Sequence, residues 1–230
     1  MHKLGFQYES FYDEIKGSQR ITDIFKKVRH HVRLAESDSS DWRAVIDSLR
    51  PHTQEIWQGL PHAEKRYFLQ HLSRHWNSAR HRMPPQAAEF LDELKESGTF
   101  ELLSGRLRHI SVDDSGRFLV NYAAKGEQSY LTVDTLINCI GSESNFSRIN
   151  SELIQKLLTV GTIRCDSVRQ GLDAAPDGRL INSDGHPSDI LRAIGTSLKG
   201  TLWETTAIPE IRVQARRLAA DLSVTADVLA

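Results

Sequence analysis

The chain has 230 residues, of which 39% are hydrophobic and 26% charged, a composition typical of globular proteins that bury a real core. Its formal net charge of −1 gives no general attraction to nucleic acid or to an anionic membrane, so neither is expected as a partner. No apolar run approaches the roughly 18 residues of a membrane span, and no signal-peptide core follows Met1, so we expect a cytoplasmic protein.

The first 98 residues predict a helical block. Residues 1–17 are aromatic and acidic without clear periodicity, which indicates an irregular lead-in that other parts of the chain should cover. Apolar residues of 18–35 then recur at helical spacing. Asp41 is a good N-cap for a short helix that stops before Pro51. Further helices are expected from Thr53, capped by its hydroxyl, from Pro61, and from about Gln86 to Gly98.

The pattern changes to a period of two after residue 98, and 99–135 predicts a β-meander. Strands at 106–112 and 117–124 flank the turn Asp113–Gly116, which favours an antiparallel hairpin. A strand at 100–105 is expected before this hairpin and another at 130–133 after it.

The third predicted domain, 136–230, opens with a continuous apolar run from Leu136 to Gly141. Such a run is typical of a strand buried on both faces of an α/β sheet, so Cys139 should be a buried, inert thiol. A helix follows from Ser151 to Gly161, and Asp-Gly turns then bracket a short strand at 179–181. A last strand is expected at 191–194.

The stretch Ala193–Arg212 has the form of a strand, a glycine-bounded loop and a helix start. Pro209 lies in the first helical turn, where proline costs no hydrogen bond. The exposed N–H groups of such a helix start suit an anion or an electron-rich carbonyl. The alternative is an ordinary final helix packed on a sheet through the apolar stripe Ile208, Ile211, Ala215, Leu218 and Leu222.

A basic run, Arg80-His81-Arg82, ends one of the predicted helices. Guanidinium groups can bind a phosphate or a carboxylate with two parallel hydrogen bonds, so this run is a candidate anion or substrate site. A solvated helix end that favours cations is the open alternative. His71 and His75 share a helical face but have no evident third ligand, so no metal site is expected.

Four tracts, taken in order over residues 41–212, resemble the C-terminal half of the YdhS-like FAD/NAD(P)-binding proteins, a family distantly similar to flavin-dependent N-hydroxylating monooxygenases and including a urate hydroxylase. The tracts are Asp41–Pro51 with Ile56-Trp57, Trp76 with Arg80–Arg82, Leu136–Gly141, and Trp203–Arg212.

The resemblance implies an α/β fold, with α+β character in isolation. The chain would be part of a flavoprotein with two dinucleotide-binding domains, consisting of the helical block, the β-meander, the final Rossmann strands and a C-terminal helix. Gly141 would lie at a strand end beside the cofactor, Gly195 and Thr196 near the ribityl-pyrophosphate, and the helix start near the isoalloxazine. The cofactor-binding residues implied are Gly141, Gly195, Thr196, Trp203, Glu204, Thr205, Thr206 and Ile208.

The function implied is that of an oxidoreductase that binds FAD, reduces it with NAD(P)H and passes electrons onward, as monooxygenases do to oxygen. The chain has no Gly-x-Gly-x-x-Gly loop, P-loop or Gly-x-Ser-x-Gly motif. The expectation is therefore a truncated or split-gene product that needs a separately encoded N-terminal flavoprotein half. One alternative is an inactive remnant or interaction module of the same fold. Another, a helical nucleic-acid-binding module, is disfavoured by the net charge.

Overall fold

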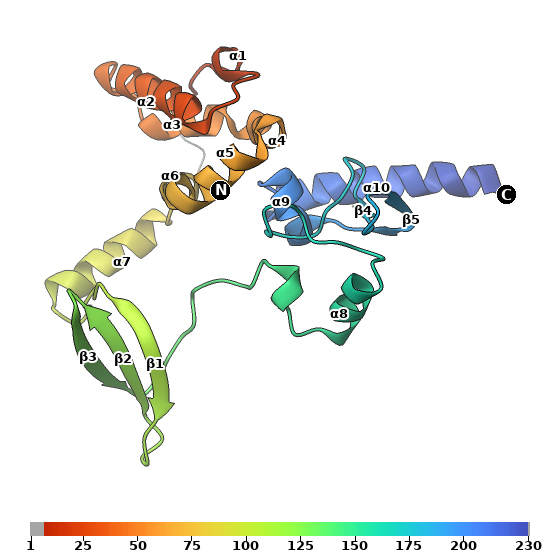
Figure 1. Cartoon of the computed structure of the whole chain (residues 1–230). Helices are drawn as coiled ribbons and strands as arrows, with labels where there is room; N and C mark the ends of the chain where they lie inside the picture. The colour runs from red at the N-terminus through yellow and green to blue at the C-terminus, as the bar shows by residue number, and fades with distance from the viewer. Residues whose placement is uncertain (1–6, 230) are drawn as a thin grey trace. The chain divides into compact units, whose positions relative to one another are not determined.

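The computed structural model of the chain describes the backbone of residues 7–229 and the side chains of 7–223. It contains both helices and strands, which confirms a mixed helix-and-sheet class (Figure 1). The chain forms two compact units. The first contains the residues up to Arg82 together with those from Glu143 onward, and the second is Met83–Ser142. These boundaries differ from the three segments, 1–98, 99–135 and 136–230, into which the sequence pattern divides the chain.

The N-terminal part of the first unit is entirely helical, as predicted. Asp41 caps α3 as expected, because its carboxylate accepts the Arg43 N–H at 2.9 Å. Thr53 does not cap α4, since its hydroxyl donates to the Leu49 carbonyl oxygen instead. The elements are α1 (Tyr12–Ile15), α2 (Ile21–Ser37), α3 (Trp42–Ser48), the 3₁₀ turn η1 (Arg50–His52), α4 (Thr53–Gly59), α5 (His62–Tyr67), the π-helical turn η2 (Phe68–Leu72) and α6 (Ser73–Arg80).

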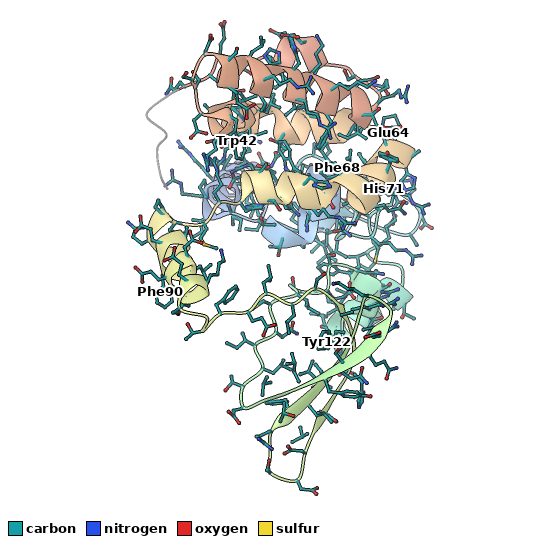
Figure 2. All side chains as sticks on the ribbon, turned by 90° about the vertical axis from the view of Figure 1, so that its left-hand side faces the viewer. Trp42, Glu64, Phe68, His71, Phe90 and Tyr122 are labelled. Atoms are coloured by element: carbon teal, nitrogen blue, oxygen red, sulfur yellow. The ribbon has the colours of Figure 1, made fainter. Side chains whose placement is uncertain are left out.

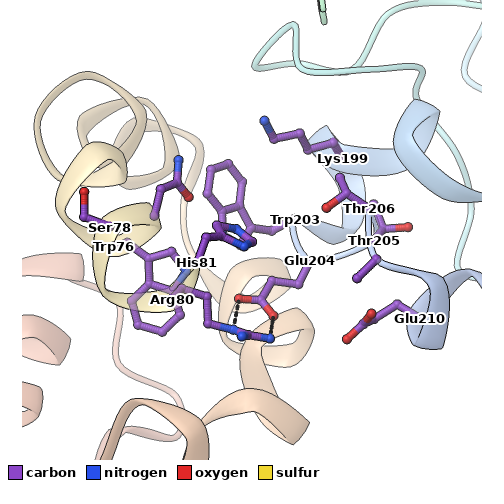
Figure 3. A pocket seen from close by; sticks show the side chains of 12 residues that line it. Trp76, Ser78, Arg80, His81, Lys199, Trp203, Glu204, Thr205, Thr206 and Glu210 are labelled. Atoms are coloured by element: carbon purple, nitrogen blue, oxygen red, sulfur yellow. Dashed lines mark hydrogen bonds and ion pairs between the residues drawn. The ribbon is translucent and has the colours of Figure 1, made fainter. Parts of the chain in front are cut away.

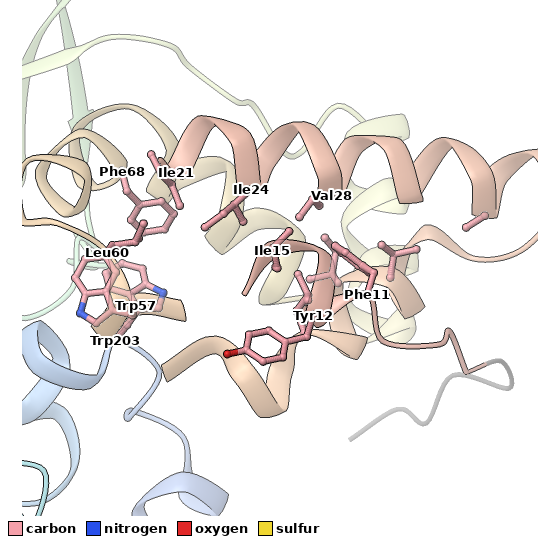
Figure 4. Close-up of a cluster of buried hydrophobic side chains, with 14 residues drawn as sticks. Phe11, Tyr12, Ile15, Ile21, Ile24, Val28, Trp57, Leu60, Phe68 and Trp203 are labelled. Carbon is pink, nitrogen blue, oxygen red and sulfur yellow. The ribbon is translucent and has the colours of Figure 1, made fainter. Parts of the chain in front are cut away.

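The main hydrophobic core lies among these helices (Figure 4). Phe11, Tyr12 and Ile15 are buried in it, so the described part of the aromatic lead-in is covered as the sequence predicts, although α1 makes it partly helical and not irregular. Residues 1–6 of the predicted lead-in lie outside the described residues. Trp203 enters the same core from the C-terminal part of the chain, where its ring stacks on Trp57 with centroids 4.9 Å apart. The C-terminal segment therefore completes the helical core.

The C-terminal part of the first unit has a smaller core and a two-stranded antiparallel sheet. The predicted strand at 179–181 is confirmed. The expected strand at 191–194 is wrong in its extent, since the strand is Pro187–Arg192 and pairs antiparallel with its predecessor rather than joining a parallel Rossmann sheet. The elements are η3 (Phe146–Arg148), α8 (Glu152–Thr159), β4 (Arg179–Ile181), β5 (Pro187–Arg192), η4 (Gly195–Leu198), α9 (Lys199–Leu202) and α10 (Ile208–Leu229).

The long helix α10 contacts the rest of its unit mainly near its start. Of the predicted apolar stripe, Ile211 and Leu218 are half-buried, whereas Ala215 and Leu222 are exposed and Ile208 is 80% exposed. The alternative of a helix packed along the whole stripe is therefore wrong, and the contacts of α10 are mainly with η4. Within the described part of the chain, none of the helices has the length and hydrophobicity needed to cross a membrane.

The second unit consists of α7 (Pro85–Glu96) and an antiparallel sheet of β1 (Arg106–Val112), β2 (Phe118–Ala124) and β3 (Glu127–Val133), in that order. The predicted hairpin around Asp113–Gly116 and the third strand are confirmed. The expected strand at 100–105 is absent. The register explains this absence, because Arg106 already pairs with Ala123, one residue from the end of β2, and 100–105 has no partner strand.

The apolar run Leu136–Gly141 is not a strand in this structure, so that prediction is wrong. Ile137 is 77% exposed, Ile140 is 89% exposed, and the thiol of Cys139 is exposed rather than buried. A strand buried on both faces needs paired neighbours and covering layers. Residues 7–229 provide no parallel strand for this run to join.

The second unit has no buried core of its own. No residue in 83–142 is buried, and large apolar side chains such as Phe90 and Leu102 are exposed. Figure 2 labels Phe90 on α7 and Tyr122, a half-buried residue of β2. The Tyr122 ring lies against Gly105, where an added Cβ would come within 2.7 Å of it. Backbone pairing therefore contributes more to the order of this unit than side-chain burial does.

Candidate functional site

A pocket of about 420 Å³ lies between the end of α6 and the segment that leads into α10, all within the first unit (Figure 3). We call it the α6–α10 pocket. Its lining residues are Trp76, Asn77, Ser78, Arg80, His81, Lys199, Trp203, Glu204, Thr205, Thr206, Ala207 and Glu210.

The pocket brings together two sets of residues that the sequence places far apart. Arg80 and His81 of the predicted anion site line it together with the predicted cofactor-binding residues Trp203, Glu204, Thr205 and Thr206. Parts of two candidate sites in the sequence therefore line one pocket in the structure.

Other predicted site residues lie elsewhere. The Arg82 guanidinium pairs with Asp47 and does not line the pocket. Gly195, Thr196 and Ile208 are also outside the lining, although they belong to the same part of the chain. Gly141 belongs to the second unit, at the end of the exposed apolar run, where its φ is +89°.

A two-point ion pair joins the two sides of the α6–α10 pocket. Nε of Arg80 lies 3.2 Å from Oε1 of Glu204, and Nη2 lies 3.3 Å from Oε2. The Arg80 and Glu204 side chains are only 10% and 14% exposed, so water screens their attraction less than it would at the surface. Gln54 also donates to the Glu204 backbone oxygen at 2.7 Å. Arg80 is thus committed to Glu204 and fixes the wall of the pocket.

Trp203 forms the back of the pocket and belongs mainly to the core. Its side chain is 6% exposed and packs against Trp57 and Phe68, while the Lys199 ammonium lies 5.4 Å from its ring centroid. Its φ of +62° is rare for a bulky residue and costs free energy that the surrounding packing must offset. Trp203, which the family resemblance implies to be a cofactor contact, thus both lines the pocket and packs in the core.

A closed set of hydrogen bonds fixes the start of α10 to the preceding glycine loop. The Gly195 N–H donates to Oε1 of Gln214 at 2.7 Å, and the buried Thr205 hydroxyl donates to the Gly195 carbonyl oxygen at 3.0 Å. Nε2 of Gln214 in turn donates to the Thr205 hydroxyl. The Gly195 N–H therefore already has an acceptor and does not provide a phosphate contact here.

Lys199 is the cation that sequence reasoning missed. Its ammonium and the His81 ring line the pocket, and neither side chain has a hydrogen bond or ion pair with another residue of the described structure. Ala207, just before α10, and Glu210, in its first turn, also line the pocket near the positive end of the helix dipole, and the Glu210 carboxylate is paired with Arg50. The position of Lys199 between Gly195 and Gly200, in the glycine-bounded loop before the last helix, was the clue available in the sequence.

Asp166 supports the short helix that carries Lys199. Its carboxylate accepts the N–H groups of Val168 and Gln170 at 2.8 and 2.7 Å, and burial raises its pKa above the usual range. Gly200 lies so close that an added Cβ would come within 2.1 Å of the carboxylate carbon. Trp57 also donates its indole N–H to the Gly200 carbonyl oxygen at 2.8 Å, so α9 is fixed on both sides.

The described side chains include no group of three His, Cys, Asp or Glu residues that could bind a metal ion. A search of protein-family models, of curated proteins and of solved structures finds no match to this chain.

Proposed function

We propose that the α6–α10 pocket binds one end of FAD, and that this chain is the C-terminal portion of an FAD/NAD(P)H-dependent oxidoreductase. The observation that carries the proposal is the convergence of Arg80-His81 and Trp203–Thr206 on one pocket. Both tracts are among the four that carry the family resemblance. The sequence pattern of neither tract predicts that the two lie side by side.

The chemistry of the pocket suits a flat, electron-rich ligand. The half-buried Trp76 offers an indole surface on one side, and Lys199 and His81 offer unpaired donors. The N–H groups at the start of α10 suit carbonyl oxygens, while the Glu204 and Glu210 carboxylates in the lining are paired with Arg80 and Arg50. Isoalloxazine combines an aromatic ring system with carbonyl groups, so these residues fit that part of the cofactor.

The size of the pocket matches part of the cofactor. A volume of about 420 Å³ lies within the range of ~300–1,000 Å³ usual for small-molecule sites. FAD as a whole is larger than drug-sized ligands, so we infer that the pocket takes the flavin end.

In this proposal, the pyrophosphate of FAD binds to residues that do not belong to this chain. The Gly195 N–H is bonded to Gln214, and neither Gly195 nor Thr196 lines the pocket. A separate segment with a glycine-rich loop, such as the N-terminal flavoprotein half that the resemblance implies, would bind the phosphates and complete the NAD(P)H site. The flavin, when bound, would supply the redox chemistry, while this chain would hold the ring and limit its access to water.

A flavin titration tests the proposal. FAD added to the purified chain should bind saturably, as seen by quenching of flavin fluorescence, and riboflavin should compete whereas ADP should not. The double variant Lys199→Ala/His81→Ala should weaken FAD binding by about tenfold or more, because hydrogen bonds to charged groups contribute ~1.5–3 kcal/mol.

The matched control is Lys156→Ala/His75→Ala, which removes the same two residue types from exposed positions outside the pocket. It should leave FAD binding unchanged. Absence of saturable FAD binding by the unaltered chain, both alone and with an N-terminal flavoprotein half supplied, would contradict the proposal. Binding without NAD(P)H oxidation in that reconstituted complex would instead identify an inactive remnant.

A further inference from the structure

A second cavity, of about 310 Å³, lies beside the first turns of α10. We call it the Arg217 cavity. It includes neither Lys199 nor His81, and Glu204 and Glu210 are the two residues that it shares with the α6–α10 pocket. Pro51, Pro209 and Val213 form an apolar part of its wall, and Arg50 and Arg217 provide its cationic groups.

The charges around the Arg217 cavity leave one cation in excess. Glu210 pairs with Arg50, whose Nη2 lies 2.8 Å from Oε1, and Glu204 pairs with Arg80. Each of the two carboxylates in the wall is therefore matched by its own arginine. Arg217 has no hydrogen bond or ion pair with any residue that the structure describes, and it is exposed at the cavity.

We propose that the Arg217 cavity binds a small organic carboxylate. The Arg217 guanidinium would bind the carboxylate through two parallel hydrogen bonds, the geometry that this pair of groups favours. The apolar body of the ligand would lie against Pro51, Pro209 and Val213.

A monoanion fits this cavity better than a phosphate dianion. One excess positive charge is balanced by one carboxylate, whereas a second negative charge would face the carboxylates of Glu204 and Glu210 in the same wall. The apolar lining also favours a ligand with a hydrocarbon portion over inorganic phosphate.

The test uses benzoate as the probe, with benzamide as its uncharged counterpart, measured by calorimetry or ligand-observed NMR on the full chain. Benzoate should bind saturably and more tightly than benzamide. Arg217→Ala should weaken benzoate binding by about tenfold or more, since a charge-assisted pair is lost. Arg217→Lys should retain part of the affinity, because the charge remains but the planar fork does not.

Arg216→Ala is the matched control, because Arg216 is the exposed neighbour on the same helix and does not line the cavity. It should leave benzoate binding unchanged. Equal affinity for benzoate and benzamide, or unchanged benzoate binding by Arg217→Ala, would overturn the proposal.

This inference is independent of the proposed flavin site, and the two can fail separately. Lys199→Ala/His81→Ala should reduce FAD binding and leave benzoate binding intact, while Arg217→Ala should have the opposite pattern. If FAD displaces benzoate and Arg217→Ala weakens both ligands equally, the Arg217 cavity is an extension of the flavin site and not a separate carboxylate site.

Discussion

The Arg80 guanidinium and the Glu204 carboxylate, 124 residues apart in sequence, form a two-point ion pair across the wall of the α6–α10 pocket. The pair joins the end of α6 to the segment before α10, and both side chains are largely shielded from water. It therefore connects the helical N-terminal part of the first unit to the segment that lines the other side of the pocket.

Removal of one partner should leave the other charge poorly compensated. Arg80→Ala should lower the free energy of unfolding by about 2 kcal/mol, because a shielded carboxylate then lacks its cation. Glu204→Ala should cost a similar amount, and the double variant should cost less than the two single changes together. Urea denaturation of the unaltered protein, the two single variants and the double variant completes this double-mutant cycle. Additive effects would show that the pair contributes no coupling.

Gly200 should tolerate no side chain. A Cβ there would meet all three carboxyl atoms of Asp166 at 2.1–2.3 Å, so Gly200→Ala requires α9 or the Asp166 loop to move. We expect a loss of about 2 kcal/mol or more in the free energy of unfolding. Gly59→Ala is the control, since nothing lies within 4 Å of its added Cβ, and it should be neutral or slightly stabilising. Equal effects of the two changes, measured by thermal or urea unfolding, would be inconsistent with the packing described.

Asp166 should make stability depend on pH in a predictable direction. Burial raises its folded-state pKa above the ordinary value of 3.8, so the folded protein holds this proton more strongly than the unfolded chain does. The resulting contribution of Asp166 to the free energy of unfolding is fully present below the pKa that this carboxyl group has in the unfolded chain. It is lost as pH rises through the raised pKa of the folded state.

The comparison with Asp166→Asn isolates this effect. The unfolding free energy of the unaltered protein minus that of the variant should fall as pH rises from below 3.8 toward neutrality, because only the carboxyl group titrates. A difference that is constant, or that grows with pH, would show that the backbone N–H bonds to the carboxylate outweigh burial at this site.

The second unit should open more readily than the main core. No residue in 83–142 is buried, so little apolar surface protects the backbone hydrogen bonds between β1, β2 and β3 from water. Amide hydrogen exchange should show protection in β1–β3 at least about tenfold lower than in the buried part of α2. Equal protection in the two regions would mean that the sheet is covered in solution.

Local sequence patterns predicted much of the secondary structure. The hairpin around Asp113–Gly116 and the cap at Asp41 were predictable because their hydrogen bonds form within a few residues of chain. The run Leu136–Gly141 could not be assigned in this way. A continuous apolar stretch becomes a buried strand only where neighbouring strands pair with it, and residues 7–229 provide none.

The candidate site was only partly predictable. The sequence presents Arg80-His81 and Trp203–Thr206 as two separate candidate binding tracts. Their spacing along the chain does not indicate that they lie close together in the fold. The burial of Trp203 and the bonding of the Gly195 N–H to Gln214 both depend on tertiary packing. These contacts involve residues that the family resemblance implies to be cofactor ligands, and no local pattern predicts them.

The most direct test of the account is a crystal structure of the chain grown with saturating FAD. The account predicts electron density for the isoalloxazine in the α6–α10 pocket, beside Trp76 and within hydrogen-bonding distance of Lys199 or His81. FAD bound at another place on the chain, with the α6–α10 pocket free of it, would contradict the central claim.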